Sequence, residues 1–215
     1  MTSGSAAPPL PPPQQPAPAA RAVSEAAHAA ADAWAQPMET AQFSRALSQL
    51  YSVLRDLGIA TRGLARYQTT GYPADPAPLG FPQHVQAGAR HLSDTWQCLN
   101  GVLVAEGFGP VPDPDEPGAV LCQAARTAIT AWRQPAGTSA DRDTTMERLV
   151  AALEFLATVA RNLAAYAPRQ RTIELLAVAA GLAGATACLR RAVHAPADDA
   201  ALEPRATDKA DGGRE

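Results

Sequence analysis

The stretch FSRALSQLYSVLRDLGIATRGLARY, residues 43–67, decides the fold. Its apolar side chains recur at alternating spacings of four and three residues, which places them on one face of an α-helix and is typical of helices packed in bundles. The face comprises Phe43, Leu47, Leu50, Leu54, Leu57, Thr61 and Leu64. We therefore expect a helix over 39–67, about 40 Å long at roughly 1.5 Å per residue, with one buried side.

Five further segments show the same spacing, and Pro- and Gly-rich stretches separate them. The segments 21–36 and 121–132 are short, whereas 85–103, 146–163 and 168–194 are long. Their apolar faces comprise Val23, Ala27, Ala30 and Trp34; Val85, Ala89, Leu92, Trp96, Leu99 and Leu103; Leu121, Ala125, Ala128 and Trp132; Met146, Leu149, Leu153, Leu156, Ala160 and Leu163; and Leu175, Ala179, Leu182, Thr186, Leu189 and Val193. A capping box of Thr144 and Glu147 is expected to begin the fifth helix.

The two halves of the chain repeat one pattern. AAHAAADAWAQP, residues 26–37, aligns with AARTAITAWRQP, residues 124–135, and both end in Trp, Gln and Pro. Further on, the alignment matches residues of the two long helices in each half. The repeated residues are Trp34 and Trp132, Pro37 and Pro135, Arg62 and Arg161, Tyr67 and Tyr166, and Cys98 and Cys188. Three consecutive segments agreeing in order and register indicate a repeated architecture.

The repeat predicts an all-α fold, a six-helix bundle made of two repeated three-helix units. Four long antiparallel helices would form a pseudo-two-fold bundle, with a short helix packed at each end and its Trp covering that end. The expected organisation is a disordered Pro-rich tail over 1–19, repeat unit A over 20–107, a linker over 108–116, repeat unit B over 117–195, and a disordered tail over 196–215.

Charge, cysteine content and motifs narrow the function. The net charge of −3 leaves no excess of basic residues, which argues against nucleic acid as a partner. Three cysteines in no zinc-ligand spacing fit a reducing cytoplasm, with Cys98 and Cys188 expected to be buried. Glu25 and His28 form a single E-x-x-H pair, whereas a ferritin-like site needs two. We expect neither a cofactor nor an enzyme.

The second half carries extra apolar residues, because Val150, Phe155 and Val159 align with Tyr51, Asp56 and Ala60. Either this helix lies centrally, or the three residues form an interaction surface. The leading hypothesis is a non-enzymatic protein–protein interaction or scaffold protein, with a protein partner or a second copy bound and the Pro-rich tail as a further contact. Arg62 and Arg161 would either pair with nearby carboxylates or bind an anionic ligand.

Two alternatives remain. A small apolar ligand could occupy a cavity between the Ala- and Gly-lined helices. The second alternative is a secreted helical-hairpin substrate or a membrane-associated protein. Residues 175–189 carry no charge but reach only about 22 Å, and Ala177, Gly181 and Ala185 form a face suited to tight helix packing. The Trp at the hairpin turn resembles the W-x-G secreted family, although the turn Gly of that family is missing after Trp34.

Overall fold

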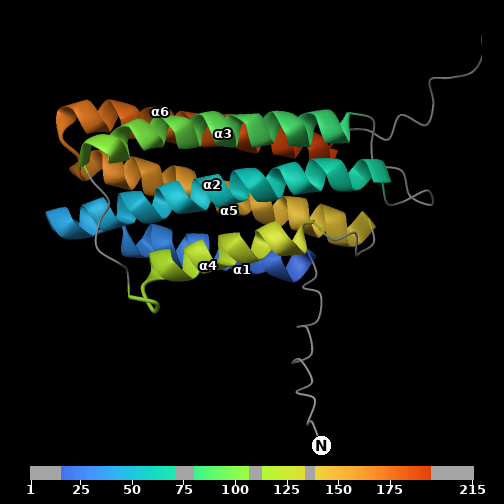
Figure 1. Ribbon diagram of the computed structural model, residues 1–215, viewed down its shortest axis with the longest axis horizontal. Coiled ribbons are helices and arrows are strands. Elements are labelled where there is room, and N and C mark those ends of the chain that lie inside the picture. The colour runs from blue at the N-terminus through green and yellow to red at the C-terminus, as the bar shows by residue number, and fades with distance from the viewer. Residues whose placement is uncertain (1–15, 71–79, 107–112, 134–138, 195–215) are drawn as a thin grey trace, which may run out of the picture.

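The computed structural model describes residues 16–70, 80–106, 113–133 and 139–194, and all regular structure in this part of the chain is helical (Figure 1). The helices are α1 (Pro16–Ala33), α2 (Thr40–Thr70), α3 (Phe81–Glu106), α4 (Pro117–Ala131), α5 (Ser139–Tyr166) and α6 (Arg169–His194). The prediction of an all-α protein is confirmed. The expected C-terminal tail, residues 1–15 of the N-terminal tail, Pro135 and the side chain of Tyr67 lie outside the described residues.

The six helices lie in three layers of two, with α1 and α4 in one outer layer, α2 and α5 in the middle, and α3 and α6 in the other outer layer (Figure 1). The main contacts join α1 to α4 and α5, α2 to α3 and α4, and α6 to α3 and α5. The short helices therefore lie alongside the long ones, and the expectation that they pack at the bundle ends is wrong. Their Ala-rich faces allow such close lengthwise approach.

The core follows the predicted apolar faces closely. Every residue named on the six faces is buried except Trp96 and Val193, which are half-buried. Burial of these side chains is the main favourable contribution to folding, and each fully buried Leu contributes about 1.5–3 kcal/mol. The 4-3 spacing in the sequence thus identifies one buried face of each helix, and further core residues, such as Val53, Phe81 and Val102, lie beside these faces.

Each repeated Trp covers the start of the other short helix. Trp132 is fully buried, and its indole Nε1 donates a hydrogen bond to the carbonyl oxygen of Pro16 at 3.2 Å. Trp34 packs against Gly118, where an added Cβ would lie 2.6 Å from the Trp34 Cζ2 atom. The start of α4 therefore requires a residue without a side chain. The two Trp rings hold α1 and α4 together, and they do not cover an end of the long helices.

Two helix starts differ from the expectation. Helix α1 begins at Pro16, so the expected disordered tail is wrong for residues 16–19. Pro16 and Pro18 are compatible with the first helical turn, where the backbone N–H groups have no partner inside the helix. Helix α5 begins at Ser139, which places Thr144 inside the helix and excludes it as the N-cap.

Helix α6 packs tightly on α3 as well as on α5. An added Cβ at Gly181 would overlap the Thr95 hydroxyl, and one at Gly184 would lie 3.2 Å from the His91 ring. By length and composition alone, Ala140–Tyr166 and Arg171–His194 could each cross a membrane. Half of the first segment's apolar window and 39% of the second's are buried inside the molecule, and core helices of soluble proteins pass the same test.

Candidate functional site

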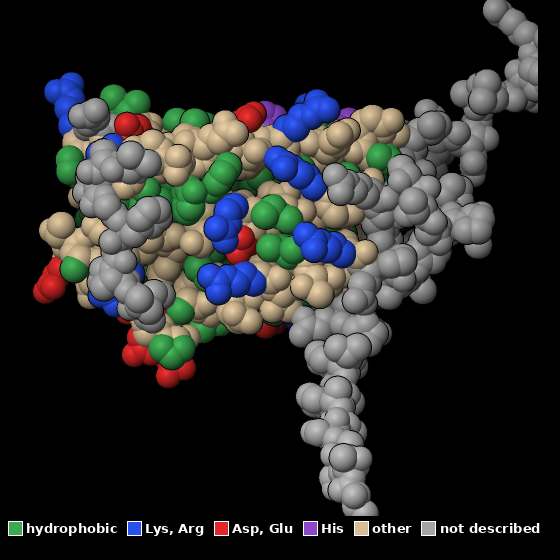
Figure 2. All heavy atoms as spheres, viewed as in Figure 1, with side chains coloured by type: hydrophobic (Ala, Val, Ile, Leu, Met, Phe, Trp, Pro, Cys, Tyr) green, Lys and Arg blue, Asp and Glu red, His purple; other side chains and the backbone are tan. Residues whose placement is uncertain are grey.

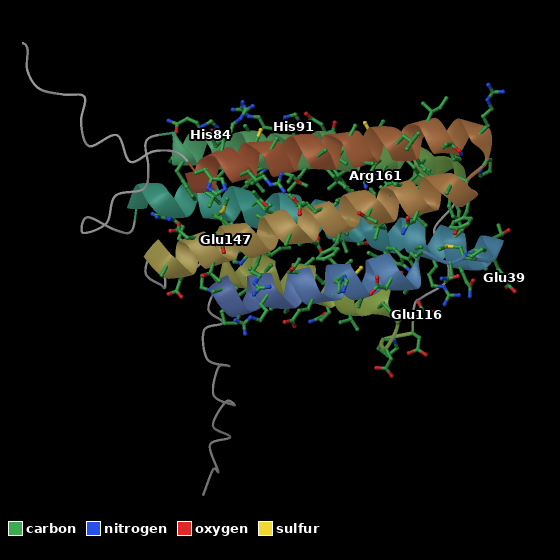
Figure 3. The ribbon with its side chains drawn as sticks, turned by 180° about the vertical axis from the view of Figure 1, so that it is seen from behind. Glu39, His84, His91, Glu116, Glu147 and Arg161 are labelled. Carbon is green, nitrogen blue, oxygen red and sulfur yellow. The ribbon has the colours of Figure 1, made fainter. Side chains whose placement is uncertain are left out.

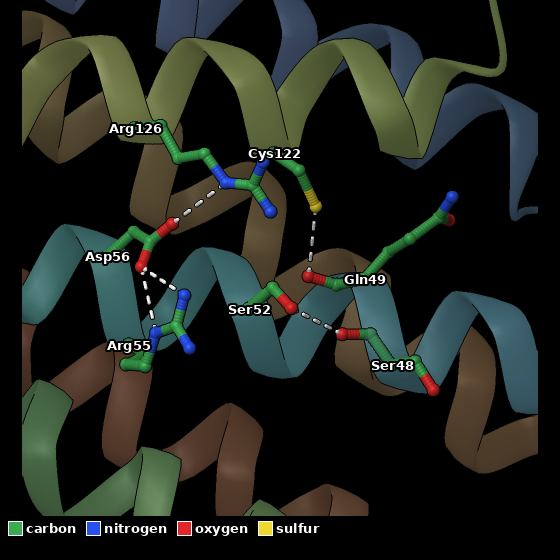
Figure 4. A network of polar contacts seen from close by, with 7 residues as sticks. All are labelled: Ser48, Gln49, Ser52, Arg55, Asp56, Cys122 and Arg126. Carbon is green, nitrogen blue, oxygen red and sulfur yellow. Dashed lines mark hydrogen bonds and ion pairs between the residues drawn. The ribbon is translucent and has the colours of Figure 1, made fainter. Parts of the chain in front are cut away.

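Polar side chains gather where α2 packs on α4. The two helices run parallel, so Arg45, Gln49 and Asp56 of α2 meet partners on the α4 side in the same chain order. Figure 4 shows the contacts of Gln49 and Asp56. Those partners are Glu116, which immediately precedes α4, and Cys122 and Arg126 within it. An interface between two helices of a core is normally apolar, so this one is the candidate functional site.

Asp56 is the buried charge of the interface, since its side chain is 2% exposed. Arg55 donates from Nε to the Asp56 Oδ1 atom at 2.9 Å, and the Arg126 Nε atom lies 3.8 Å from Oδ2. Oδ2 has no hydrogen-bond partner among the described residues. The Arg55 and Arg126 side chains remain 44% and 62% exposed. Asp56 thus anchors two guanidinium groups that still face the solvent.

Cys122 lies between Asp56 and Gln49. Its thiol donates a hydrogen bond to the Gln49 carbonyl oxygen, with Sγ and O 3.5 Å apart (Figure 4). The pKa of the Cys122 thiol is raised to about 11, mainly by burial; the Arg126 charge lowers it, the Asp56 charge raises it and the Arg55 charge lowers it. The thiol is therefore neutral at physiological pH and is a poor nucleophile, because reactivity requires the thiolate.

A cavity lies at the other end of the interface. Arg45 Nη1 donates to Glu116 Oε1 at 2.5 Å, and Gln49 Nε2 donates to Glu116 Oε2 at 3.4 Å. The cavity encloses about 280 Å³, and its walls include Trp34, Met38 and these polar residues. Figure 3 shows Glu116 at the same end of the molecule as Glu39. The volume is near the lower limit for a small-molecule site.

Exposed arginines surround the Asp56 end of the interface. We define the arginine patch as Arg55 and Arg62 of α2, Arg126 of α4, Arg133 in the turn just after α4, and Ile59, which lies one helical turn from each arginine of α2. All four arginines are exposed, and Ile59 is 38% exposed. Arg62 also donates to the Ser93 hydroxyl of α3 at 2.9 Å. Figure 2 shows basic side chains gathered around apolar ones over α2 and α4.

The α1–α5 interface resembles this one in geometry but not in chemistry. Its helices also run parallel, because His28 contacts Phe155 and the Tyr166 hydroxyl donates to the Ala35 carbonyl oxygen at 2.9 Å. The ring centroids of His28 and Phe155 are 4.6 Å apart. In the alignment of the two halves, Phe155 matches Asp56 and His28 matches Arg126. One interface therefore places an ion pair where the other places two packed rings.

Two of the three residues that were expected to form an interaction surface are buried. Val159 is fully buried, Val150 is 8% exposed, and only Phe155 is half-buried. Helix α5 contacts both α1 and α6, and these neighbours cover the apolar residues beside its main face. Of the two options left open by the sequence, the central position of this helix is correct.

Other repeated residues lie apart from the candidate site. Cys98 is exposed and Cys188 is half-buried, so the expectation that both are buried is wrong. Cys98 is an exposed position of α3 beside the buried Leu99. Arg161 is exposed on α5 (Figure 3), a helix that contributes no residue to the arginine patch.

Sequence reasoning missed Asp56 and Arg126. Asp56 immediately precedes Leu57, a core position, and its counterpart in the second half is Phe155. An acid that aligns with a large apolar residue beside a core position was the signal for a buried carboxylate.

Comparison with known proteins gives no relative. No protein-family model, curated protein or solved structure matches the chain.

Proposed function

We propose that this chain is a non-enzymatic interaction protein, a rigid helical frame that binds a protein partner on the α2–α4 face. The observation that carries the proposal is the buried Asp56, which anchors two exposed arginines. Burying a carboxylate costs several kcal/mol, and its ion pairs offset only part of that cost. Arginine is also enriched among the residues that contribute most to protein binding.

The proposal includes two repeated three-helix units, over 20–107 and 117–195, with their four long helices antiparallel. The helix contacts support it: exchanging α1 with α4, α2 with α5 and α3 with α6 leaves the set of contacting pairs unchanged. Aligned residues also meet in pairs, since Asp56 contacts Arg126 and Phe155 contacts His28. Two copies of one unit would then have kept their packing while one interface changed its chemistry.

The comparison between the interfaces supports a binding role. Phe155 and His28 pack the α1–α5 interface without a buried ion pair, so the packing geometry does not require one. Asp56 and its arginines are therefore better explained by the surface they present than by the stability they give.

The chemistry of the thiols fits the rest of the proposal. Because its pKa is about 11, the Cys122 thiol stays protonated, which disfavours a nucleophilic role. Cys98, Cys122 and Cys188 are all free. Free thiols, one of them exposed, stay reduced in a reducing compartment, and we therefore propose a cytoplasmic location.

A second candidate function, binding of a small molecule, is favoured by the cavity beside Trp34. The cavity is lined by polar as well as apolar groups, and it lies at the start of α4, not between the Ala- and Gly-lined long helices. Native mass spectrometry of freshly purified protein tests this candidate. A bound mass that is lost on mild heating is expected, and a spectrum of bare protein alone would contradict it.

The interaction proposal is tested in two measurements on the full chain. Sedimentation of the purified protein gives its own association state, and purification at endogenous expression after mild cross-linking gives its partners. We expect either self-association or a stoichiometric protein partner. A strictly monomeric protein in sedimentation, together with no stoichiometric partner in the purification, would contradict the proposal.

A further inference from the structure

We infer that the arginine patch is the docking surface for an acidic amphipathic helix of a partner protein, one that presents carboxylates around a central apolar side chain. The inference rests on the proposed function and names the chemistry of the partner. It follows from the spacing of the four arginines, from the absence of exposed acids among them, and from the apolar centre.

The spacing defines a compact square. Arg55 and Arg62 are seven residues apart on α2, which separates them by about 10 Å along the helix. Arg126 lies beside Asp56, the neighbour of Arg55, and Arg133, in the turn after α4, lies beside Gly63, the neighbour of Arg62. Packed helix axes lie about 8–10 Å apart, which sets the other side of the square. Ile59 is exposed, and its spacing of four residues from Arg55 and three from Arg62 places it on the same face of α2. A single helix with acids one or two turns apart matches this area.

The charged side chains that are exposed on the arginine patch are all positive. From Leu57 to its end α2 contains no Asp or Glu, and α4 contains none at all. Asp56 is buried beneath the arginines and is already paired with Arg55 and Arg126. Exposed guanidinium groups with no exposed acid between them bind carboxylates in charge-assisted, often bidentate, hydrogen bonds.

The apolar centre favours a protein partner over a nucleic acid. A nucleic-acid site is an extended basic surface that contacts many phosphates, whereas this patch is confined to a square of about 10 Å. The chain as a whole carries a net charge of −3, which repels a long polyanion. Ile59 offers its contact area to an apolar side chain. An acidic helix with a Leu or Phe at its centre satisfies both features.

Asp56 is a positioning residue in this surface. It holds Arg55 through a hydrogen bond to Oδ1 and lies within ion-pair distance of Arg126, so two of the four cations are oriented before the partner arrives. Such preorganisation lowers the side-chain entropy that binding would otherwise cost.

The test uses the full chain and a synthetic helical peptide of about 18 residues, with Leu on one face and Glu at the flanking i±3 and i±4 positions. Fluorescence anisotropy measures binding of the labelled peptide. We expect saturable binding that weakens with added salt, and about tenfold weaker binding by the Arg62→Glu/Arg133→Glu variant. Neither residue pairs with Asp56, so this variant keeps the buried ion pair. The control is Arg148→Glu/Arg161→Glu, which makes the same charge change at two exposed arginines of α5 and is expected to bind normally.

Three results would overturn the inference. Binding that the control variant loses as strongly as the patch variant would show general charge attraction. Equal binding of a peptide that has the same composition but dispersed Leu residues would show that binding does not need an apolar face on the peptide. The role given to Ile59 would then be wrong. Tighter binding of a single-stranded oligothymidylate, or of phosphatidylserine vesicles, would assign the patch to phosphate groups instead.

The outcome can be separated from that of the proposed function. If a partner recovered from cells still binds Arg62→Glu/Arg133→Glu, the interaction function holds and the docking surface is wrong. If the wild-type chain recovers no partner and does not self-associate, the function fails whatever the peptide does.

Discussion

The α2–α4 and α1–α5 interfaces solve one packing problem in two ways. Both join a short helix to a long helix that runs parallel to it. In one, Asp56 is buried beneath Arg55 and Arg126; in the other, Phe155 packs against His28. The difference teaches that the frame can be built without a buried charge. The charge is therefore the feature that needs a functional explanation.

The largest expected effect comes from the two Trp residues that hold together α1 and α4, the short helices of the two interfaces. Trp132→Ala should lower the free energy of unfolding by about 3–5 kcal/mol, because the ring is fully buried and its N–H bonds to the Pro16 carbonyl. Urea denaturation followed by circular dichroism measures it. Trp34→Ala should lower the free energy of unfolding by less, because Trp34 borders the cavity. Equal losses for the two variants would contradict this difference between the two rings.

The second-largest expected effect on stability comes from placing an Asp in the α1–α5 interface. Phe155→Asp places a carboxylate on the α1–α5 contact, where it loses the packing of the ring and gains only His28 as a partner. The free energy of unfolding should fall by about 2–4 kcal/mol. The matched control is Phe155→Leu, which should cost about 1 kcal/mol. A cost for the Asp variant no larger than for the Leu variant would mean that this interface is open to solvent.

The thiol of Cys122 reports how well the α2–α4 interface is closed. With its pKa raised to about 11, Cys122 in a Cys98→Ser/Cys188→Ser background should react with a thiol reagent at pH 8 roughly a hundredfold more slowly than a free thiol. The rate should climb as the pH approaches 11. The comparison protein is Cys122→Ser/Cys188→Ser, which leaves the exposed Cys98. Similar rates for the two proteins would show that the interface opens readily.

Much of the fold was predictable because one rule governs it. The 4-3 spacing of apolar residues identified six helices and one buried face of each, since burial of one helix face is what the pattern encodes. It missed buried residues beside those faces, such as Val53, Val102 and Val178. The lengthwise packing of α1 and α4 was not predictable, because it depends on which Ala-rich faces meet. Helix α1 begins at Pro16, earlier than expected, and the hydrogen bond from Trp132 to the Pro16 carbonyl stabilises a turn that the local sequence leaves undecided. Helix α5 also begins earlier than expected, at Ser139.

The candidate site was predictable only in part. The alignment of the halves singled out Arg62 and the Asp56–Phe155 difference, but it predicted an interaction surface at Phe155 and not a buried carboxylate at Asp56. Val150 and Val159 proved to be core residues because two helices cover α5. The meeting of Asp56 with Arg126 depends on the parallel packing of α2 and α4, which no local pattern specifies.

The most direct test is Asp56→Phe, which gives the α2–α4 interface the residue that its counterpart has. If the carboxylate serves binding and not folding, the variant should be as stable as the wild type or up to about 2 kcal/mol more stable, because Arg55 and Arg126 can turn into the solvent. It should also bind the acidic helical peptide several-fold more weakly. A variant that is markedly less stable yet binds the peptide normally would contradict the account.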